Sequence, residues 1–209
     1  MATATPTAPT STAAPGRWNA LLRLLEYVAY PAAAGAAFTL LALGVVTWLP
    51  ALAAVGGALQ RWRTTGDSRC FTGVLTAFPR YWRALWRYSC AGAAVSVLLA
   101  ANAWYLLHVA SPLSMVLLAA QAGIAAALVI LAVAVAAQAG REPEAGARAW
   151  LRDGFALGFG SPARGTALLG AAVSAVLVSL VVPLGPLLLG PSVPVLLALS
   201  FADPRRNTA

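Results

Sequence analysis

The chain has 209 residues, of which 60% are hydrophobic and only 10% charged, whereas a soluble domain carries about 25% charged residues. A soluble core of this size cannot bury so much apolar surface, so the composition excludes an ordinary soluble domain and favours a protein of the lipid bilayer. The net charge of +8 comes from 14 Arg, no Lys and six acidic residues. These Arg lie in short gaps between apolar runs, where the positive-inside rule expects them, so we expect no nucleic-acid partner.

The first part of the chain predicts a tail, a membrane span and a short helix. Residues 1–16 are mostly Ala, Thr and Pro without apolar periodicity, which predicts a disordered tail. Residues 28–49 are long enough to cross a hydrocarbon core of about 30 Å, and Pro50 is expected to end that helix. The apolar stretch that follows is half the length a span requires, so 51–63 is predicted to be an interfacial helix.

An amphipathic helix is predicted over 71–89. Three Arg recur at spacings i, i+3 and i+7 on one face, namely Arg80, Arg83 and Arg87. The opposite face carries Tyr81, Leu85 and Tyr88, which we expect to sink into the lipid headgroups. This helix is therefore expected to lie flat on the cytoplasmic face, attracted to anionic lipids and free to contact a partner subunit. Trp82 and Trp86 are expected to anchor it at the interface, the alternative being that their rings stack on a sugar.

Two further spans, 90–107 and 113–138, are separated by a turn without formal charge. Asn102 and Gln121 are the polar residues nearest the middle of these spans, and a hairpin could bring them to a similar depth. We expect a hydrogen bond between the helices, with contact to a polar substrate as the alternative. Small residues four apart, at Gly92 and Ser96 and again at Gly123 and Ala127, would let neighbouring helices approach closely, although such spacings also arise by chance in a chain so rich in Ala.

The remaining sequence predicts a third interfacial helix at 147–157 and an apolar block that prolines divide into spans 165–183 and 187–202. Residues 204–209 form a second tail. The predicted fold is thus all-α: a polytopic membrane helical bundle, one membrane domain over 17–203, with about five transmembrane helices plus interfacial amphipathic helices.

The distribution of Arg predicts the orientation. Twelve of the 14 Arg fall in the two long loops and the C-terminal tail, which places these segments in the cytoplasm. Five spans then put the N-terminus, with Arg17 and Arg23, outside. If the apolar stretch at 51–60 crossed the membrane, all 14 would lie on the cytoplasmic side.

The order of several short segments resembles the YesL-like family of small bacterial integral membrane proteins of unknown function. These segments are WLPALAA at 48–54, RWR at 61–63, FPRYWR at 78–83 and LRDGFAL at 151–157, the last followed by Ser161 and Pro162. The likeness covers roughly residues 20–203 and rests on the order and spacing of elements. Because such proteins are commonly encoded beside genes for carbohydrate uptake, the resemblance implies a link to sugar import, but it supplies no catalytic or binding residues.

These observations predict a multi-pass protein of a bacterial inner membrane that acts as an accessory or scaffold subunit linked to carbohydrate uptake. The alternative is a small permease for a neutral polar solute, although no acidic residue lies well inside a span to couple transport to protons or sodium. The sequence lacks the common enzyme motifs, and Cys70 and Cys90 have no His nearby, so we expect no catalytic, cofactor-binding or metal-binding residue. The expected partners are anionic lipids and subunits of a transporter, and a homo-oligomer remains an option.

Overall fold

A computed structural model describes residues 17–42, 44, 46–109, 111–181 and 190–202. Within these ranges the chain forms seven helices and no strand, so the prediction of an all-α fold is confirmed. The helices are α1 (Arg17–Ala42), α2 (Trp48–Thr65), α3 (Cys70–His108), α4 (Pro112–Arg141), α5 (Ala147–Phe159), α6 (Pro162–Val181) and α8 (Ser192–Phe201). Both predicted tails, 1–16 and 204–209, lie outside the described residues.

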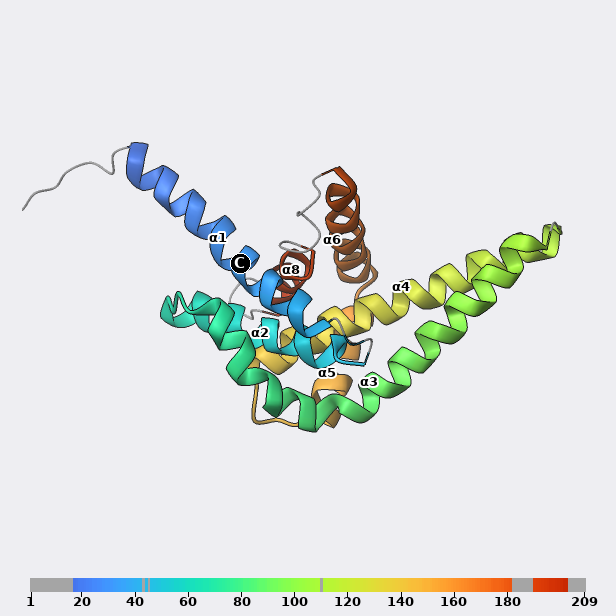
Figure 1. The fold of residues 1–209 in the computed structure, drawn as a ribbon, viewed down its shortest axis with the longest axis horizontal. Coiled ribbons are helices and arrows are strands. Elements are labelled where there is room, and N and C mark those ends of the chain that lie inside the picture. The colour runs from blue at the N-terminus through green and yellow to red at the C-terminus, as the bar shows by residue number, and fades with distance from the viewer. Residues whose placement is uncertain (1–16, 43, 45, 110, 182–189, 203–209) are drawn as a thin grey trace, which may run out of the picture.

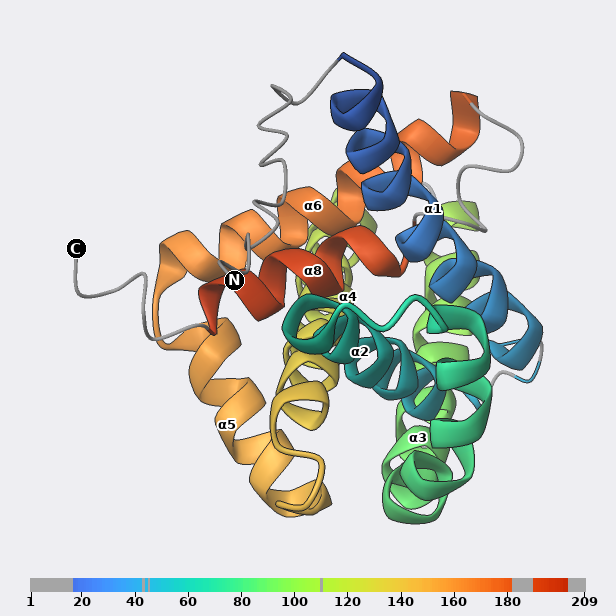
Figure 2. The same cartoon turned by 90° about the vertical axis from the view of Figure 1, so that its left-hand side faces the viewer.

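Helix α2 lies at the centre of the molecule, packed mainly against α3 and α4 (Figure 2). Every residue from Leu49 to Leu59 is buried, so the segment expected to be an interfacial helix over 51–63 instead forms the core. Pro50 does not end a helix. It lies in the first turn of α2, where the missing N–H would have no partner within the helix. At the other end, Gly66 adopts a left-handed conformation (φ 69°), and its N–H bonds the Trp62 carbonyl to end the helix.

The backbones of α2 and α4 meet without intervening side chains. A Cβ atom added to Gly56 would lie 2.2 Å from the carbonyl oxygen of Ala136, and one added to Gly140 would lie 2.5 Å from the carbonyl oxygen of Gly56. Ala136 and Gly140 are four residues apart on α4, the spacing of small residues that lets membrane helices approach closely. The contact therefore tolerates no side chain larger than hydrogen at either glycine.

The small-residue pairs expected from the sequence do not form this kind of contact within the chain. A Cβ added to Gly92 or Gly123 would meet no atom within 4 Å. Each of these glycines faces open space, so their spacing does not create a close helix crossing inside the described part of the protein.

Helix α3 is continuous over 39 residues and joins two elements that the sequence predicts separately, the interfacial helix 71–89 and the span 90–107. Its first half packs along α2, and its second half projects from the body beside α4 as a long hairpin (Figure 1). In the turn, the Ser111 side chain accepts a hydrogen bond from the Leu113 N–H, and Pro112 occupies the first turn of α4. Helix α4 extends a few residues beyond the predicted span 113–138.

Among the described residues, two helices, α3 and α4, are long and apolar enough to cross a membrane, fewer than the five expected. The predicted span 28–49 is interrupted because α1 ends at Ala42 and α2 begins at Trp48. The predicted span 165–183 corresponds to α6. The predicted span 187–202 shortens to the ten residues of α8, about 15 Å of helix and half of a hydrocarbon core. Residues 182–189 lie outside the described part.

Helix α5 packs against α4 through two glycines one turn apart. A Cβ added to Gly154 would lie 2.9 Å from Val135, and one added to Gly158 would lie 2.9 Å from Ile130. The later glycine on α5 meets the earlier residue on α4, so the two helices are antiparallel. Trp150 and Leu157 are buried, so the helix expected at the interface over 147–157 has one face in the protein core.

The α2–α4 crossing gives a direct test of the packing. In an open helix position, replacing Gly by Ala stabilises by up to about 1 kcal/mol. We expect this gain at Gly123, whereas Gly56→Ala should destabilise by about 1–3 kcal/mol because the new methyl group meets a backbone carbonyl. Thermal unfolding of both variants in detergent measures the difference. Equal melting temperatures for Gly56→Ala and Gly123→Ala would show that α2 and α4 do not touch at Gly56.

Candidate functional site

The first half of α3 is docked on protein. Its buried residues are Cys70, Val74, Tyr81, Leu85 and Ser89. Two of these, Tyr81 and Leu85, are residues that the sequence analysis assigned to the lipid headgroups; the structure places them instead against the core. Apolar periodicity identifies the buried face of a helix but not whether lipid or protein covers it. The third, Tyr88, is exposed.

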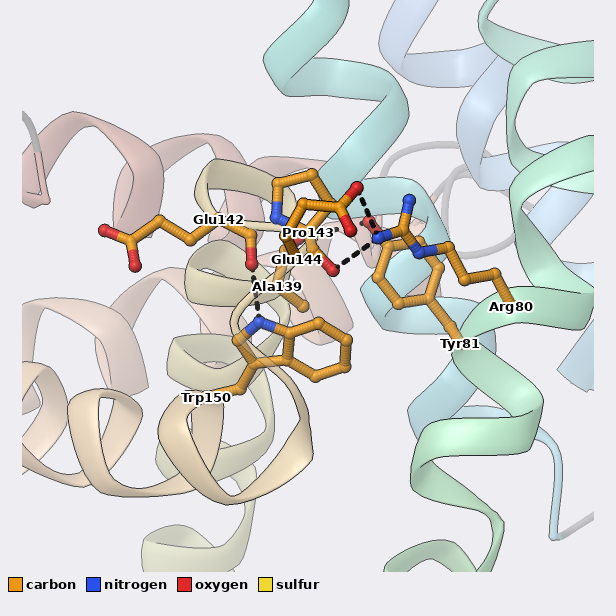
Figure 3. A network of polar contacts seen from close by, with 7 residues as sticks. All are labelled: Arg80, Tyr81, Ala139, Glu142, Pro143, Glu144 and Trp150. Carbon is orange, nitrogen blue, oxygen red and sulfur yellow. Dashed lines mark hydrogen bonds and ion pairs between the residues drawn. The ribbon is translucent and has the colours of Figure 1, made fainter.

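Tyr81 joins three helices at the end of α4 that lies away from the hairpin turn (Figure 3). Its hydroxyl donates a hydrogen bond to the carbonyl oxygen of Ala139 at 3.1 Å. The hydroxyl also lies directly over Gly57 of α2, where an added Cβ would approach it to 2.8 Å. The Tyr81 ring lies against Trp150 of α5, with centroids 5.6 Å apart. Burial raises the pKa of the Tyr81 hydroxyl, so the group stays protonated and able to donate.

Arg80 holds the connection between α4 and α5. One guanidinium nitrogen donates to the carbonyl oxygen of Pro143 at 2.8 Å and lies 2.8 Å from a carboxylate oxygen of Glu144. Glu144 raises the pKa of Arg80 through this hydrogen bond. On the other side of the connection, the Trp150 indole N–H donates to the Glu142 carbonyl at 2.7 Å (Figure 3). We call this set of contacts the Tyr81 cluster, made of Arg80, Tyr81, Ala139, Glu142, Pro143, Glu144 and Trp150.

The three Arg expected to act together have different surroundings. Arg80 is bound within the chain, whereas Arg83 and Arg87 are exposed and form no ion pair or hydrogen bond with the described residues. Trp82 is partly buried and stacks on Phe78, with centroids 6.0 Å apart, while Trp86 remains 47% exposed. Of these five residues, Arg83, Arg87 and Trp86 are exposed and are not held by a hydrogen bond or ion pair with the described residues, whereas the exposed Arg80 is paired with Glu144.

Asn102 and Gln121 lie in contact in the hairpin, at the similar depth expected of them. The Asn102 side-chain amide donates to the Gln121 side-chain oxygen at 3.0 Å. The Gln121 amide nitrogen in turn donates to the Leu99 carbonyl. Gln121 is buried and Asn102 is exposed, and the hydrogen bond between the two amides ties α3 to α4. Throughout the described residues, each buried side-chain nitrogen or oxygen has a hydrogen-bond partner.

An apolar groove of about 430 Å³ opens where α3 and α4 separate toward the body of the molecule. Its walls come from the second half of α3 and the middle of α4, with Trp48 of α2 and Leu151 of α5 at one end. We call it the hairpin groove. The sequence analysis did not identify it, because a groove depends on the angle between two helices rather than on either pattern alone. In the same described part, no three His, Cys, Asp or Glu residues lie close enough to hold a metal ion.

Removing the hydroxyl oxygen of Tyr81 tests the central hydrogen bond of the Tyr81 cluster. Tyr81→Phe leaves the Ala139 carbonyl without this donor in a buried site, so we expect a loss of about 1–3 kcal/mol in the free energy of unfolding. Tyr88→Phe on the same helix is the matched control, because Tyr88 is exposed and makes no hydrogen bond with the described residues. Denaturant or thermal unfolding in detergent compares the two variants. If both lose the same stability, the Tyr81 hydroxyl does not hold α3 to α4.

Comparison of the chain with models of known protein families, with curated proteins and with solved structures finds no match. The resemblance to the YesL-like family therefore stays a prediction.

Proposed function

We propose that this chain is an integral protein of a bacterial inner membrane, anchored by the α3–α4 hairpin, and that it serves as an accessory or scaffold subunit. The observation that supports this proposal is the exposure of the hairpin. Leu98, Trp104 and Met115 are each about 70% exposed, at 69%, 71% and 71%. In the most apolar windows of α3 and α4, only 11% and 22% of residues are buried, unlike the core helix of a soluble protein.

Length supports the same arrangement. Helix α4 has 30 residues, about 45 Å of helix, which exceeds the hydrocarbon core of about 30 Å. The second half of α3 matches the apolar part of α4 across the Asn102–Gln121 pair. Every backbone group within such a helix is hydrogen-bonded internally, as lipid requires.

The hairpin also brings the Arg-bearing ends of its two helices to the same side. Arg83 and Arg87 precede the apolar half of α3, and Arg141 and Arg148 follow that of α4, while the turn at 109–111 carries no Arg. The positive-inside rule then favours the cytoplasmic side for these Arg-bearing ends and the opposite side for the turn. The cytoplasmic C-terminus, the external N-terminus and the other three expected spans remain predictions, which reporter fusions after residues 20, 110, 185 and 209 would test.

An accessory role fits the polar groups better than a permease does. A permease for a neutral polar solute needs polar groups free to replace the water around its substrate. In the hairpin, Asn102 donates a hydrogen bond to Gln121 and Gln121 donates one to the backbone, and the hairpin groove is almost wholly apolar. The proposed link to a carbohydrate importer comes from the YesL-like resemblance, and the exposed Arg83, Arg87 and Trp86 supply a surface for the partner subunit.

The anchoring part of the proposal predicts a difference between two positions on one helix. Leu98→Asp places a carboxylate in the projecting half of α3, at a cost of about 2.5–3.5 kcal/mol if that half is in lipid. Leu75→Asp changes an exposed leucine in the half docked on α2, which should remain outside the membrane. We expect Leu98→Asp to reduce the fraction of protein that resists alkaline carbonate extraction and Leu75→Asp to leave it unchanged. Equal extraction of the two variants would argue against the hairpin as the anchor.

The accessory role is tested by comparing sugar uptake by cells with sugar entry into liposomes that contain the purified protein alone. Deleting the chain in its native cell should reduce uptake of a sugar, and affinity purification should recover transporter subunits with it. The purified protein alone in liposomes should not admit that sugar. Sugar entry into such liposomes would instead establish the permease alternative.

A further inference from the structure

The hairpin groove has the length of one membrane leaflet. Its lining residues on α3 run from Tyr88 to Leu99 and those on α4 from Ala125 to Val135. At about 1.5 Å per residue, these stretches cover roughly 15–17 Å. Half of a hydrocarbon core is about 15 Å. The groove therefore extends from the cytoplasmic edge of the proposed membrane segment to about its middle.

The groove has walls suited to hydrocarbon rather than water. Among its lining side chains, only Ser96, Tyr88 and Trp48 carry a polar atom. Tyr88 and Trp48 lie at the end nearest the body, where amphipathic aromatic residues are favoured at a membrane interface. An apolar groove open to the bilayer fills with acyl chain because water there would lose hydrogen bonds.

The volume argues against a second helix as the occupant. A helix about 10 Å across fills on the order of 120 Å³ per residue, so a groove of about 430 Å³ would hold about one turn. A flexible hydrocarbon chain can enter a narrow space along its whole length, whereas a helix could only lie across the opening.

Two exposed Arg precede lining residues of the groove at the end nearest the body. Arg87 lies four residues before the lining residue Ala91 on α3, and Arg148 lies three residues before the lining residue Leu151 on α5, so each is within about one helical turn of a residue that lines the groove. Both are exposed and form no ion pair with the described residues. Their positive charge complements a phosphate that would sit at the end of an acyl chain in the groove.

We propose that the hairpin groove is a binding site for one anionic phospholipid of the cytoplasmic leaflet. One acyl chain lies between α3 and α4, and the headgroup phosphate lies at Arg87 and Arg148. The lipid closes the space that the diverging helices leave and makes the hairpin surface continuous for a partner subunit. This inference rests on the proposed membrane location, and it adds a specific lipid site to it.

The open space at Gly92 allows the groove to be filled without disturbing the fold. Gly92 lines the groove, and a Cβ there meets no atom within 4 Å, as at Gly123, which lies outside the groove. Gly92→Phe should therefore occupy the groove, while Gly123→Phe adds the same side chain to the same hairpin elsewhere. The probe is a nanodisc of equal parts phosphatidylglycerol and phosphatidylethanolamine, from which the protein is released into mild detergent and analysed by native mass spectrometry.

We expect the unmodified protein and Gly123→Phe to retain one phosphatidylglycerol, and Gly92→Phe to lose it. Arg87→Gln should lower the preference for phosphatidylglycerol over phosphatidylethanolamine about fivefold, and Arg69→Gln, in the loop before α3, should leave it unchanged. Equal lipid retention by the two Phe variants would overturn the proposal. So would a dimer of the unmodified protein that Gly92→Phe converts to monomer, because the groove would then be an interface between copies. Carbonate extraction of the same samples is a separate readout: release of the unmodified protein would contradict the membrane location itself.

Discussion

The backbone contact between α2 and α4 is the constraint on which the rest of the molecule depends. With Gly56 and Gly140 pressed against each other's helices, α2 lies too close to α4 for any larger residue at the crossing. This closeness brings Gly57 under the hydroxyl of Tyr81, which can then reach the Ala139 carbonyl at the end of α4. The same end of α4 turns into α5, and two further glycines hold α5 against it. Small residues thus bring the helices of the core close together at these crossings.

This packing divides α3 and α4 into two halves with different surroundings. The halves that lie near α2 and α5 are covered by protein and fixed by hydrogen bonds. The halves toward the hairpin turn are joined by the Asn102–Gln121 hydrogen bond and expose large apolar side chains. Because α3 leaves α4 to follow α2, a wedge opens between them at the boundary of the two halves. The hairpin groove lies at that divergence, and the proposed lipid site depends on it.

The sequence predicted most of what depends on a single helix. The length and hydropathy of 113–138 identified α4 to within a few residues, and the positions of Asn102 and Gln121 indicated their common depth. It did not predict features that depend on a second helix. An Ala- and Gly-rich run ending at Arg61 looks interfacial from its length, yet it is buried because its small residues let α4 cover it. Likewise, the buried face of 71–89 was visible from its periodicity, but lipid and protein are equally apolar neighbours for Leu85.

The central claim is that lipid surrounds the projecting half of the hairpin while protein surrounds α2. Spin labels at Leu98 and Val116, which are 69% and 65% exposed, and at the buried Val55 test it in reconstituted bilayers. Collision rates with oxygen, which concentrates in lipid, are compared with those of a water-soluble nickel chelate. The account predicts high oxygen and low chelate collision rates at Leu98 and Val116, and low rates of both at Val55. Frequent collisions with the chelate at Leu98 and Val116 would contradict it, because the hairpin would then lie in water.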